Sequence, residues 1–200
     1  RSKTYGDAVT FAGTEFTSTG LINGDAVNSI SLNSAGAVAT ASVAGSAYSI
    51  VPSAASGSGL ANYSISYTNG ALTVTRKDLV IVNTDRSKTY GEVLTNADFA
   101  GSITGIQNSD NITLTRSSTG SAAGATAATT YPIAATLADP DNKLANYTVT
   151  NTNGTLTVTQ KALAITATDR SKTYGDAVTF AGTEFTSTGL INGDAVNSIS

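Results

Sequence analysis

Lysine and tyrosine recur together in one hexapeptide, R-S-K-T-Y-G, which begins at Arg1, Arg86 and Arg170. These side chains could form an exposed stripe that binds a ligand by cationic and aromatic contacts. In the architectural alternative, the tyrosine ring packs at the edge of a core with its hydroxyl bonded to the backbone, and the glycine permits a turn. We favour the architectural interpretation, which makes structural markers of Tyr5, Gly6, Tyr90, Gly91, Tyr174 and Gly175.

A covalent role for the hexapeptide lysine is a further hypothesis. An isopeptide crosslink needs a lysine, an asparagine and an acid buried together on neighbouring strands. Lys88 with Asn151 or Asn153 meets the residue types. Because lysine side chains usually lie at the surface, we do not favour this chemistry.

Acidic residues suggest one weak metal site. Asp139, Asp141 and Asn142 share one loop, and oxygen ligands two residues apart can bind Ca²⁺. The aligned stretch of the preceding copy, S-A-A-S-G-S-G, has no acid. We therefore expect an Asp-Pro-Asp turn with side-chain hydrogen bonds, and we predict no metal site and no cofactor.

One aspartate recurs in each copy, in the pattern Asn, then Gly or Ser, then Asp. The residues are Asp25, Asp110 and Asp194. This pattern is typical of a turn, or of a carboxylate that locks the backbone.

The composition excludes several functions. The 200 residues include no histidine and no cysteine, so catalysis by Ser–His or Cys–His pairs and zinc sites of His or Cys are excluded. With 12% charged residues and a net charge of -3, the chain has no basic surface for nucleic acid. No apolar run is long enough to cross a membrane. We expect a protein that is not an enzyme, since catalytic sites are rarely copied along a chain.

The hexapeptide belongs to a long tandem repeat. Tyr5, Tyr90 and Tyr174 are spaced by 85 and 84 residues, and residues 170–200 repeat residues 1–31 letter for letter. We predict a first repeat at 1–77 that lacks its leading strand, a complete second repeat at 78–161, and a truncated third repeat at 162–200. Either a longer chain supplies the missing strands, which we favour, or neighbouring chains donate them.

Alternating apolar and polar residues predict strands throughout each repeat. The expected strands include 78–85 and 162–169, in which Leu79, Ile81, Leu163 and Ile165 point inward, and also 99–104, 112–116 and 130–137. The Asn69-Gly70 and Asn153-Gly154 pairs predict type I′ hairpin turns. About seven short strands per repeat indicate an antiparallel β-sandwich, and linkers of two residues limit bending between repeats.

These motifs resemble a known family. K-T-Y-G-D, T-G-L-I-N-G-D, Y-S-I and N-Y-S-I-S-Y-T-N-G-A-L-T-V-T occur in this order. The sequence is similar to the MBG-type (YGX-type) repeats of bacterial surface adhesins and filamentous-haemagglutinin-like proteins. The resemblance implies an all-β chain of tandem immunoglobulin-like modules, extracellular and non-catalytic.

The leading functional hypothesis is a structural stalk or filament region of a surface or secreted adhesin. Its expected partners are neighbouring repeats of the same long chain, with self-assembly into filaments, and a host or matrix surface reached through other regions. The alternative is that the repeats act as a multivalent module that binds glycan or protein.

Overall fold

A computed structural model describes residues 1–200 and contains no α-helix. Its only helical segments are five single turns of 3-10 helix, and none of them could span a membrane. The prediction of an all-β chain is confirmed. The turns are η1 (Ala35–Ala37), η2 (Leu60–Asn62), η3 (Asn96–Asp98), η4 (Thr119–Ser121) and η5 (Leu144–Asn146).

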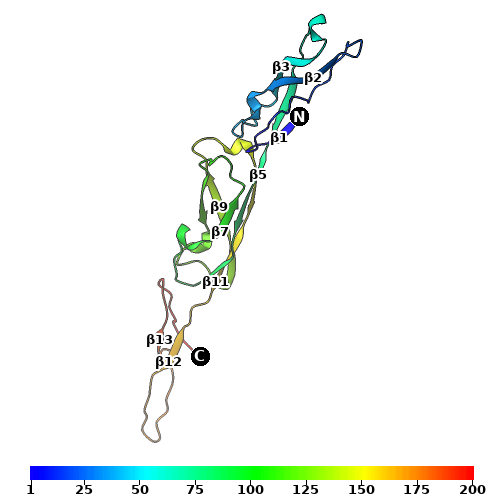
Figure 1. Ribbon diagram of the computed structural model, residues 1–200. Helices are drawn as coiled ribbons and strands as arrows, with labels where there is room; N and C mark the ends of the chain where they lie inside the picture. Colours follow the sequence, from blue (N-terminus) through cyan, green and yellow to red (C-terminus); the bar gives the residue numbers. More distant parts are fainter. The chain divides into compact units, whose positions relative to one another are not determined.

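Thirteen strands follow the sequence repeats (Figure 1). The first repeat carries β1 (Ser2–Thr4), β2 (Ala26–Asn33), β3 (Tyr48–Ser58) and β4 (Gly70–Thr75). The second carries β5 (Lys77–Asn83), β6 (Arg86–Thr89), β7 (Gly101–Thr104), β8 (Thr113–Ser117), β9 (Thr129–Ala138), β10 (Tyr147–Thr152) and β11 (Gly154–Thr159). The third carries β12 (Ala164–Ala167) and β13 (Phe185–Thr188).

Equivalent strands of the first two repeats pair in the same order, β1-β4-β3-β2 and β6-β11-β9-β8. In the second repeat a further sheet, β10-β5-β7, provides the second layer that a β-sandwich requires. The hexapeptide strand pairs in parallel with the last strand of its repeat, with Lys3 opposite Val74 and Lys88 opposite Val158. The predicted antiparallel arrangement is therefore wrong at this edge, where no hairpin connects the two strands.

The predicted hairpin at Asn153-Gly154 is also wrong. The preceding strand β10 belongs to the three-stranded sheet and the following strand β11 to the four-stranded sheet, so the chain crosses between layers. Neither residue has a positive φ. Glycine is instead needed at position 154 because the backbone of Thr84 lies very close. A Cβ atom on residue 154 would lie 2.6 Å from the backbone oxygen of Thr84. In the first repeat no tight hairpin forms at Asn69-Gly70 either, because residues 64–69 form no strand and β4 pairs with the more distant β3.

The chain divides into two compact units. Unit 1 comprises 1–81, 103–114 and 137–150, and unit 2 comprises 82–102, 115–136 and 151–200. Each unit takes residues from two sequence repeats, and the predicted domain boundaries at residues 77 and 161 stay predictions. The core of unit 1 contains Tyr5, Ala41, Val74, Leu79, Ile112 and Tyr147. A core in unit 2 contains Phe99, Ile133 and Leu156.

The leading strands of the second and third repeats differ in burial. Leu79 and Ile81 on β5 are completely buried, as predicted. Leu163 and Ile165 occupy the same positions beside and on β12 but are 45% and 43% exposed, so the prediction that they point into a core is wrong. The reason is that β12 pairs with β13 alone in a two-stranded sheet.

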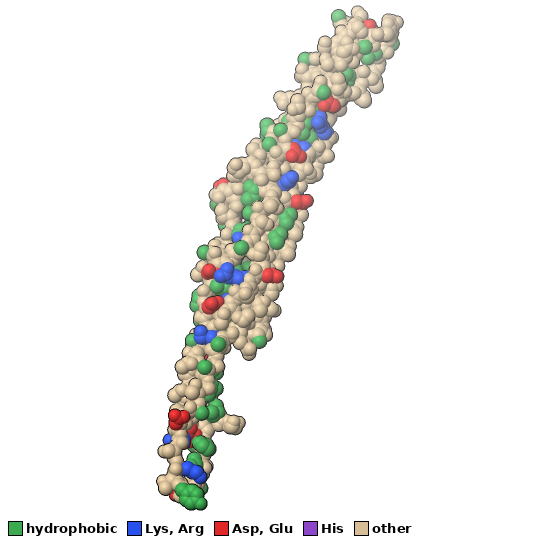
Figure 2. Space-filling model, turned by 60° about the horizontal axis from the view of Figure 1, so that its bottom comes forward, with side chains coloured by type: hydrophobic (Ala, Val, Ile, Leu, Met, Phe, Trp, Pro, Cys, Tyr) green, Lys and Arg blue, Asp and Glu red, His purple; other side chains and the backbone are tan.

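Charged side chains are sparse at the surface. On the face drawn in Figure 2, lysine, arginine and acidic side chains are scattered singly or in small groups among uncharged ones. This distribution agrees with the 12% of charged residues and offers no strongly basic surface there.

Candidate functional site

Tyr5 lies immediately after β1, where the chain turns away from the sheet. Its backbone nitrogen donates to the carbonyl of Thr75, which extends the parallel pairing with β4 by one residue. Gly6 follows with a φ of 95°, in the region that favours glycine. A side chain at Gly6 would also collide with Gln107, because a Cβ there would lie 2.7 Å from the Gln107 Cδ atom. The tyrosine is thereby directed toward the second repeat.

The hydroxyl of Tyr5 meets an aspartate of the next repeat. It lies 2.9 Å from Oδ2 of Asp110, and the hydroxyl of Tyr147 lies 2.6 Å from the same oxygen. The backbone nitrogen of Gln107 donates to the Tyr147 hydroxyl at 2.9 Å. We call Tyr5, Asp110, Tyr147 and Gln107 the junction cluster. The prediction that the tyrosine hydroxyl binds the backbone is wrong for Tyr5.

The two tyrosine rings pack as well as hydrogen-bond. Their centroids are 5.5 Å apart and their planes are inclined by 77°, an edge-to-face arrangement. Tyr5 is 2% exposed and Tyr147 is 4% exposed. The rings belong to a core that also contains Val74 from the first repeat and Leu79 from the second. The first and second repeats therefore share one continuous hydrophobic core.

Three further hydrogen bonds cross the same junction. The amide of Asn108 donates to the carbonyl of Ala39, and the backbone nitrogen of Val43 donates to the side chain of Asn146. Arg76 Nε donates to the carbonyl of Ala145. The segment Leu144-Ala145-Asn146-Tyr147 thus provides apolar, backbone, amide and aromatic contacts to the first repeat in four consecutive residues.

The electrostatics of the junction cluster favour protonated phenols. Burial raises the pKa of Tyr147, and the hydrogen bond to the Asp110 carboxylate raises it further. Burial is also the main cause that raises the pKa of Tyr5. Both tyrosines therefore act as hydrogen-bond donors to the carboxylate at neutral pH.

The aspartate and tyrosine pairing recurs within the first repeat. Tyr63, which corresponds to Tyr147, donates to Asp25 at 2.8 Å, and Asp25 corresponds to Asp110. Each aspartate does lie in a turn, because its backbone nitrogen donates to the carbonyl of the residue three positions earlier. Asp25 donates to Ile22 and Asp110 donates to Gln107. The sequence also suggested that these carboxylates lock the backbone. In the structure they accept hydrogen bonds from tyrosine hydroxyls instead.

The three hexapeptide tyrosines have three different environments. Tyr5 is buried, Tyr90 is half-buried and Tyr174 is fully exposed. Tyr90 lines a hollow together with Asp194, the aspartate of the third repeat. The glycines that follow them, Gly91 and Gly175, have φ angles of 97° and 95°. The copies therefore share a backbone turn but do not form an evenly exposed stripe for a ligand.

The hexapeptide lysines are buried in the first two copies. Lys88 is 3% exposed, and its amine donates to the carbonyls of Glu92 and Ala122. Lys3 makes the equivalent bonds to Asp7 and Val38. Burial lowers the pKa of both amines. These lysines close a loop by binding carbonyl oxygens.

Asn151, one of the two asparagines considered for an isopeptide, has other partners. Asn151 donates to the carbonyl of Ala135 at 2.8 Å and accepts from Asn83. The amine of Lys88 bonds to carbonyls and not to an asparagine side chain. The structure thus brings lysine into the interior but does not join it to Asn151 or Asn153.

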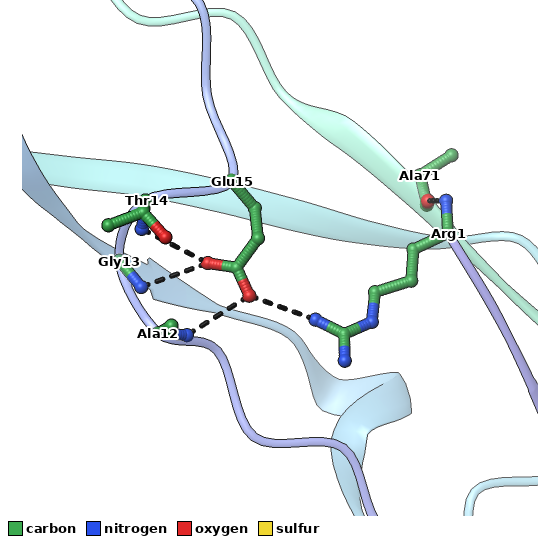
Figure 3. Close-up of polar contacts among 6 residues, drawn as sticks. All are labelled: Arg1, Ala12, Gly13, Thr14, Glu15 and Ala71. Atoms are coloured by element: carbon green, nitrogen blue, oxygen red, sulfur yellow. Dashed lines mark hydrogen bonds and ion pairs between the residues drawn. The ribbon is translucent and has the colours of Figure 1, made fainter.

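The arginine of the hexapeptide has a role that the sequence did not indicate. In the first copy, Arg1 donates to Glu15 at 3.0 Å, and the Glu15 carboxylate also accepts from the backbone nitrogens of Ala12, Gly13 and Thr14 (Figure 3). The other copies repeat the ion pair as Arg86 with Asp98 at 3.8 Å and Arg170 with Glu184 at 3.9 Å. The recurring distance of 12 to 14 residues from arginine to acid was the available signal.

The acidic loop of the second repeat is organised by its own backbone. Asp139 accepts from the backbone nitrogens of Lys143 and Leu144, both at 2.8 Å, as expected of an Asp-Pro-Asp turn. Asn142 has a φ of 54°, and Asp141 is exposed. No three acidic residues lie close enough to form a metal-binding group.

Alkaline pH is expected to distinguish the native chain from Tyr147→Phe. At pH 7 the substitution should cost about 1.5–3 kcal/mol, the usual contribution of a hydrogen bond to a charged group. Because the folded-state pKa of Tyr147 is raised, this contribution is complete below the unfolded pKa of about 10 and is lost as the pH rises through the folded-state pKa. Urea unfolding at pH 7 to 11 measures the free energy of unfolding of both proteins. The difference between the native chain and Tyr147→Phe should become smaller only above pH 10.

The control for this titration is Tyr174→Phe, whose phenol is exposed and should change nothing at any pH. Lysine titration is common to all three proteins and cancels from the comparison. A difference that stays constant up to pH 11 would contradict a phenol held protonated by the fold.

Acidic pH is expected to loosen the loop around Glu15. Hydrogen bonds from the backbone, that of Ala12 foremost, lower the pKa of Glu15. The bonding is therefore complete above the unfolded pKa of about 4.5 and is lost as the pH falls through the folded-state pKa. Amide exchange at Ala12, Gly13 and Thr14 should become faster in that range. Glu15→Gln should exchange faster already at pH 7, and unchanged exchange would exclude the carboxylate as the organising group.

Comparison with known proteins agrees with the repeat analysis. The family model described as MBG domain (YGX type) matches residues 1–73 and again residues 79–157. No curated protein and no solved structure shows significant similarity to the chain. The matched family is a β-rich repeat module and is not a known enzyme family.

Proposed function

Because the chain belongs to the MBG domain family of YGX type, we propose that its repeats form a structural stalk or filament region of a bacterial surface adhesin, outside the cell. The observation that carries this proposal is the junction cluster. A phenol of one repeat is buried against a carboxylate and a second phenol of the next. Such a joint resists bending and separation, which is what a stalk requires of consecutive modules.

The chemistry of the cluster supports a mechanical role. Its phenols have raised pKa values and its carboxylate is occupied by two hydrogen bonds, so none of these groups is free to act as a nucleophile or a base. The 200 residues contain no cysteine, so no disulfide contributes to their stability.

Force spectroscopy of the full chain tests the proposal. The native chain should unfold its first two repeats at higher force than Asp110→Ala, while Asp25→Ala should leave the force at the junction unchanged. Equal unfolding forces for the native chain and Asp110→Ala would show that the junction cluster does not hold the first two repeats together.

A glycan array with the full chain examines the alternative of a binding module. We expect no reproducible binding. Binding that disappears in Tyr90→Ala or Tyr174→Ala, the accessible hexapeptide tyrosines, would overturn a purely structural role.

A further inference from the structure

The two tyrosines of the junction cluster lie in an arrangement that packing alone does not require. Tyr5 belongs to the first repeat and Tyr147 to the second, and their ring centroids are 5.5 Å apart. Both hydroxyls lie close to one oxygen, Oδ2 of Asp110, at 2.9 Å and 2.6 Å. The two hydroxyl oxygens cannot be further apart than the sum of these distances, so the hydroxyl ends of the two rings converge.

The shared carboxylate is a proton acceptor for both phenols. A phenol loses an electron most readily when its proton can pass to a base at the same time. Asp110 is half-buried and follows two exposed residues, Asn108 and Ser109, so its carboxylate connects the cluster to solvent.

Burial protects the rings themselves. Tyr5 and Tyr147 are both buried in one hydrophobic core. A phenoxyl radical formed on either ring is therefore shielded from dissolved reagents that would react with it. Its nearest aromatic neighbour is the other tyrosine of the pair.

We propose that Tyr5 and Tyr147 form a site of oxidative crosslinking, at which a dityrosine bond joins consecutive repeats. The co-reactant is a small one-electron oxidant of the class of the carbonate radical anion. It need not enter the core, because an electron can leave a buried ring across a short distance of packed protein to the surface beside Asp110.

The reaction consumes two oxidant radicals for each crosslink. Each phenol loses one electron and its hydroxyl proton, which passes through Asp110, and becomes a phenoxyl radical. Each carbonate radical takes up one electron and one proton and becomes bicarbonate. The two phenoxyl radicals form one carbon–carbon bond between ring positions next to the hydroxyls. Each ring then transfers the hydrogen at that position to its oxygen, so the product has two hydrogen atoms fewer than the original chain.

The crosslink would close residues 6–146 into a covalent loop. Such a loop restricts the unfolded chain and cannot be extended by a force applied at its two ends. The 200 residues have no cysteine with which to form an equivalent disulfide. The biological meaning of this crosslink rests on the stalk role proposed above, whereas its formation does not.

Peptide mapping of the full chain after exposure to photochemically generated carbonate radicals tests the site. Trypsin and Asp-N protease together place Tyr5 in the peptide 4–6 and Tyr147 in the peptide 144–161, each with one tyrosine. We expect a linked pair of these peptides, two hydrogen atoms lighter than their sum. Its yield should not depend on protein concentration, because both tyrosines belong to one chain.

Conservative variants separate the site from general tyrosine oxidation. Tyr5→Phe and Tyr147→Phe should each abolish the linked peptides. Tyr63→Phe is the matched control and should leave their yield unchanged, since Tyr63 also donates to a carboxylate, that of Asp25, but does not belong to the ring pair. Asp110→Asn should slow the crosslink by roughly tenfold or more, because the positioned base is lost.

Oxidation in urea supplies the control for folding. The linked peptides should then disappear, because 142 residues separate the two tyrosines along the chain. Equal yields with and without urea would overturn the site, as would a folded native chain whose peptides 4–6 and 144–161 stay unlinked while other tyrosines couple. Neither result would alter the unfolding force of the unoxidised junction, which tests the stalk role separately.

Discussion

Replacement of Tyr5 by alanine is expected to lower the free energy of unfolding of unit 1 by about 3–5 kcal/mol, the usual range for a large buried aromatic side chain. The substitution leaves a cavity beside Val74 and Leu79 and removes one phenol from Asp110. Urea unfolding followed by circular dichroism measures the loss, and amide exchange assigns it to unit 1.

Tyr174→Ala is the matched control for this experiment, since the same hexapeptide surrounds it but its side chain is fully exposed. It should change stability by no more than about 0.5 kcal/mol. Tyr5→Phe keeps the ring and should fall between the two, at about 1.5–3 kcal/mol. Equal effects of Tyr5→Ala and Tyr174→Ala would show that the junction cluster does not stabilise the chain.

Replacement of Lys88 by alanine should destabilise unit 2 by about 3 kcal/mol, because the carbonyl oxygens of Glu92 and Ala122 lose the buried amine that donates to both. The loss of the aliphatic stem adds to the effect. The free energy of unfolding of unit 2, obtained from amide exchange in β6 and β11, is the quantity to measure.

Lys172→Ala is the control for Lys88, because this amine is exposed and lies 3.3 Å from the carbonyl of Asp176. Its effect should be within about 0.5 kcal/mol. Lys88→Met retains the stem and lacks the donor, so it separates the two contributions and should give an intermediate loss. Were Lys88→Ala as stable as the native chain, the amine could not be the group that closes the loop.

The strands were predictable because alternation is a local property. A pleated strand places every second residue on one face, so the spacing of Leu79 and Ile81 was enough to indicate β5 and its buried side. The same reasoning gave β8 and β9, whose bounds lie within a few residues of the expected ones.

The connections between strands were less predictable. An Asn-Gly pair indicates a tight turn when both flanking strands belong to one sheet. At Asn153-Gly154 the flanking strands belong to different sheets, and sequence alternation carries no information about which sheet a strand joins. Glycine is needed at position 154 because a Cβ atom there would collide with the backbone oxygen of Thr84.

The junction cluster could not be derived from spacing. Tyr5 and Asp110 are separated by 105 residues, and their contact depends on how one repeat packs on the next. The available signal was that a tyrosine and an aspartate recur in every copy, which indicated structural importance but no partner. The arginine and acid pairs differ in this respect, since they lie within each copy and their recurring spacing of 12 to 14 residues was a signal that could have indicated them.

The sequence by itself determined the tandem repeat, the all-β class and the exclusion of histidine and cysteine chemistry, because these follow from composition and local period. Only the tertiary structure decided what each copy of the hexapeptide does. Tyr5 is buried, Tyr90 borders a hollow and Tyr174 is exposed, although the six residues around them are identical. The physical reason is that burial depends on the side chains that a neighbouring segment supplies, and identical residues meet different neighbours along the chain.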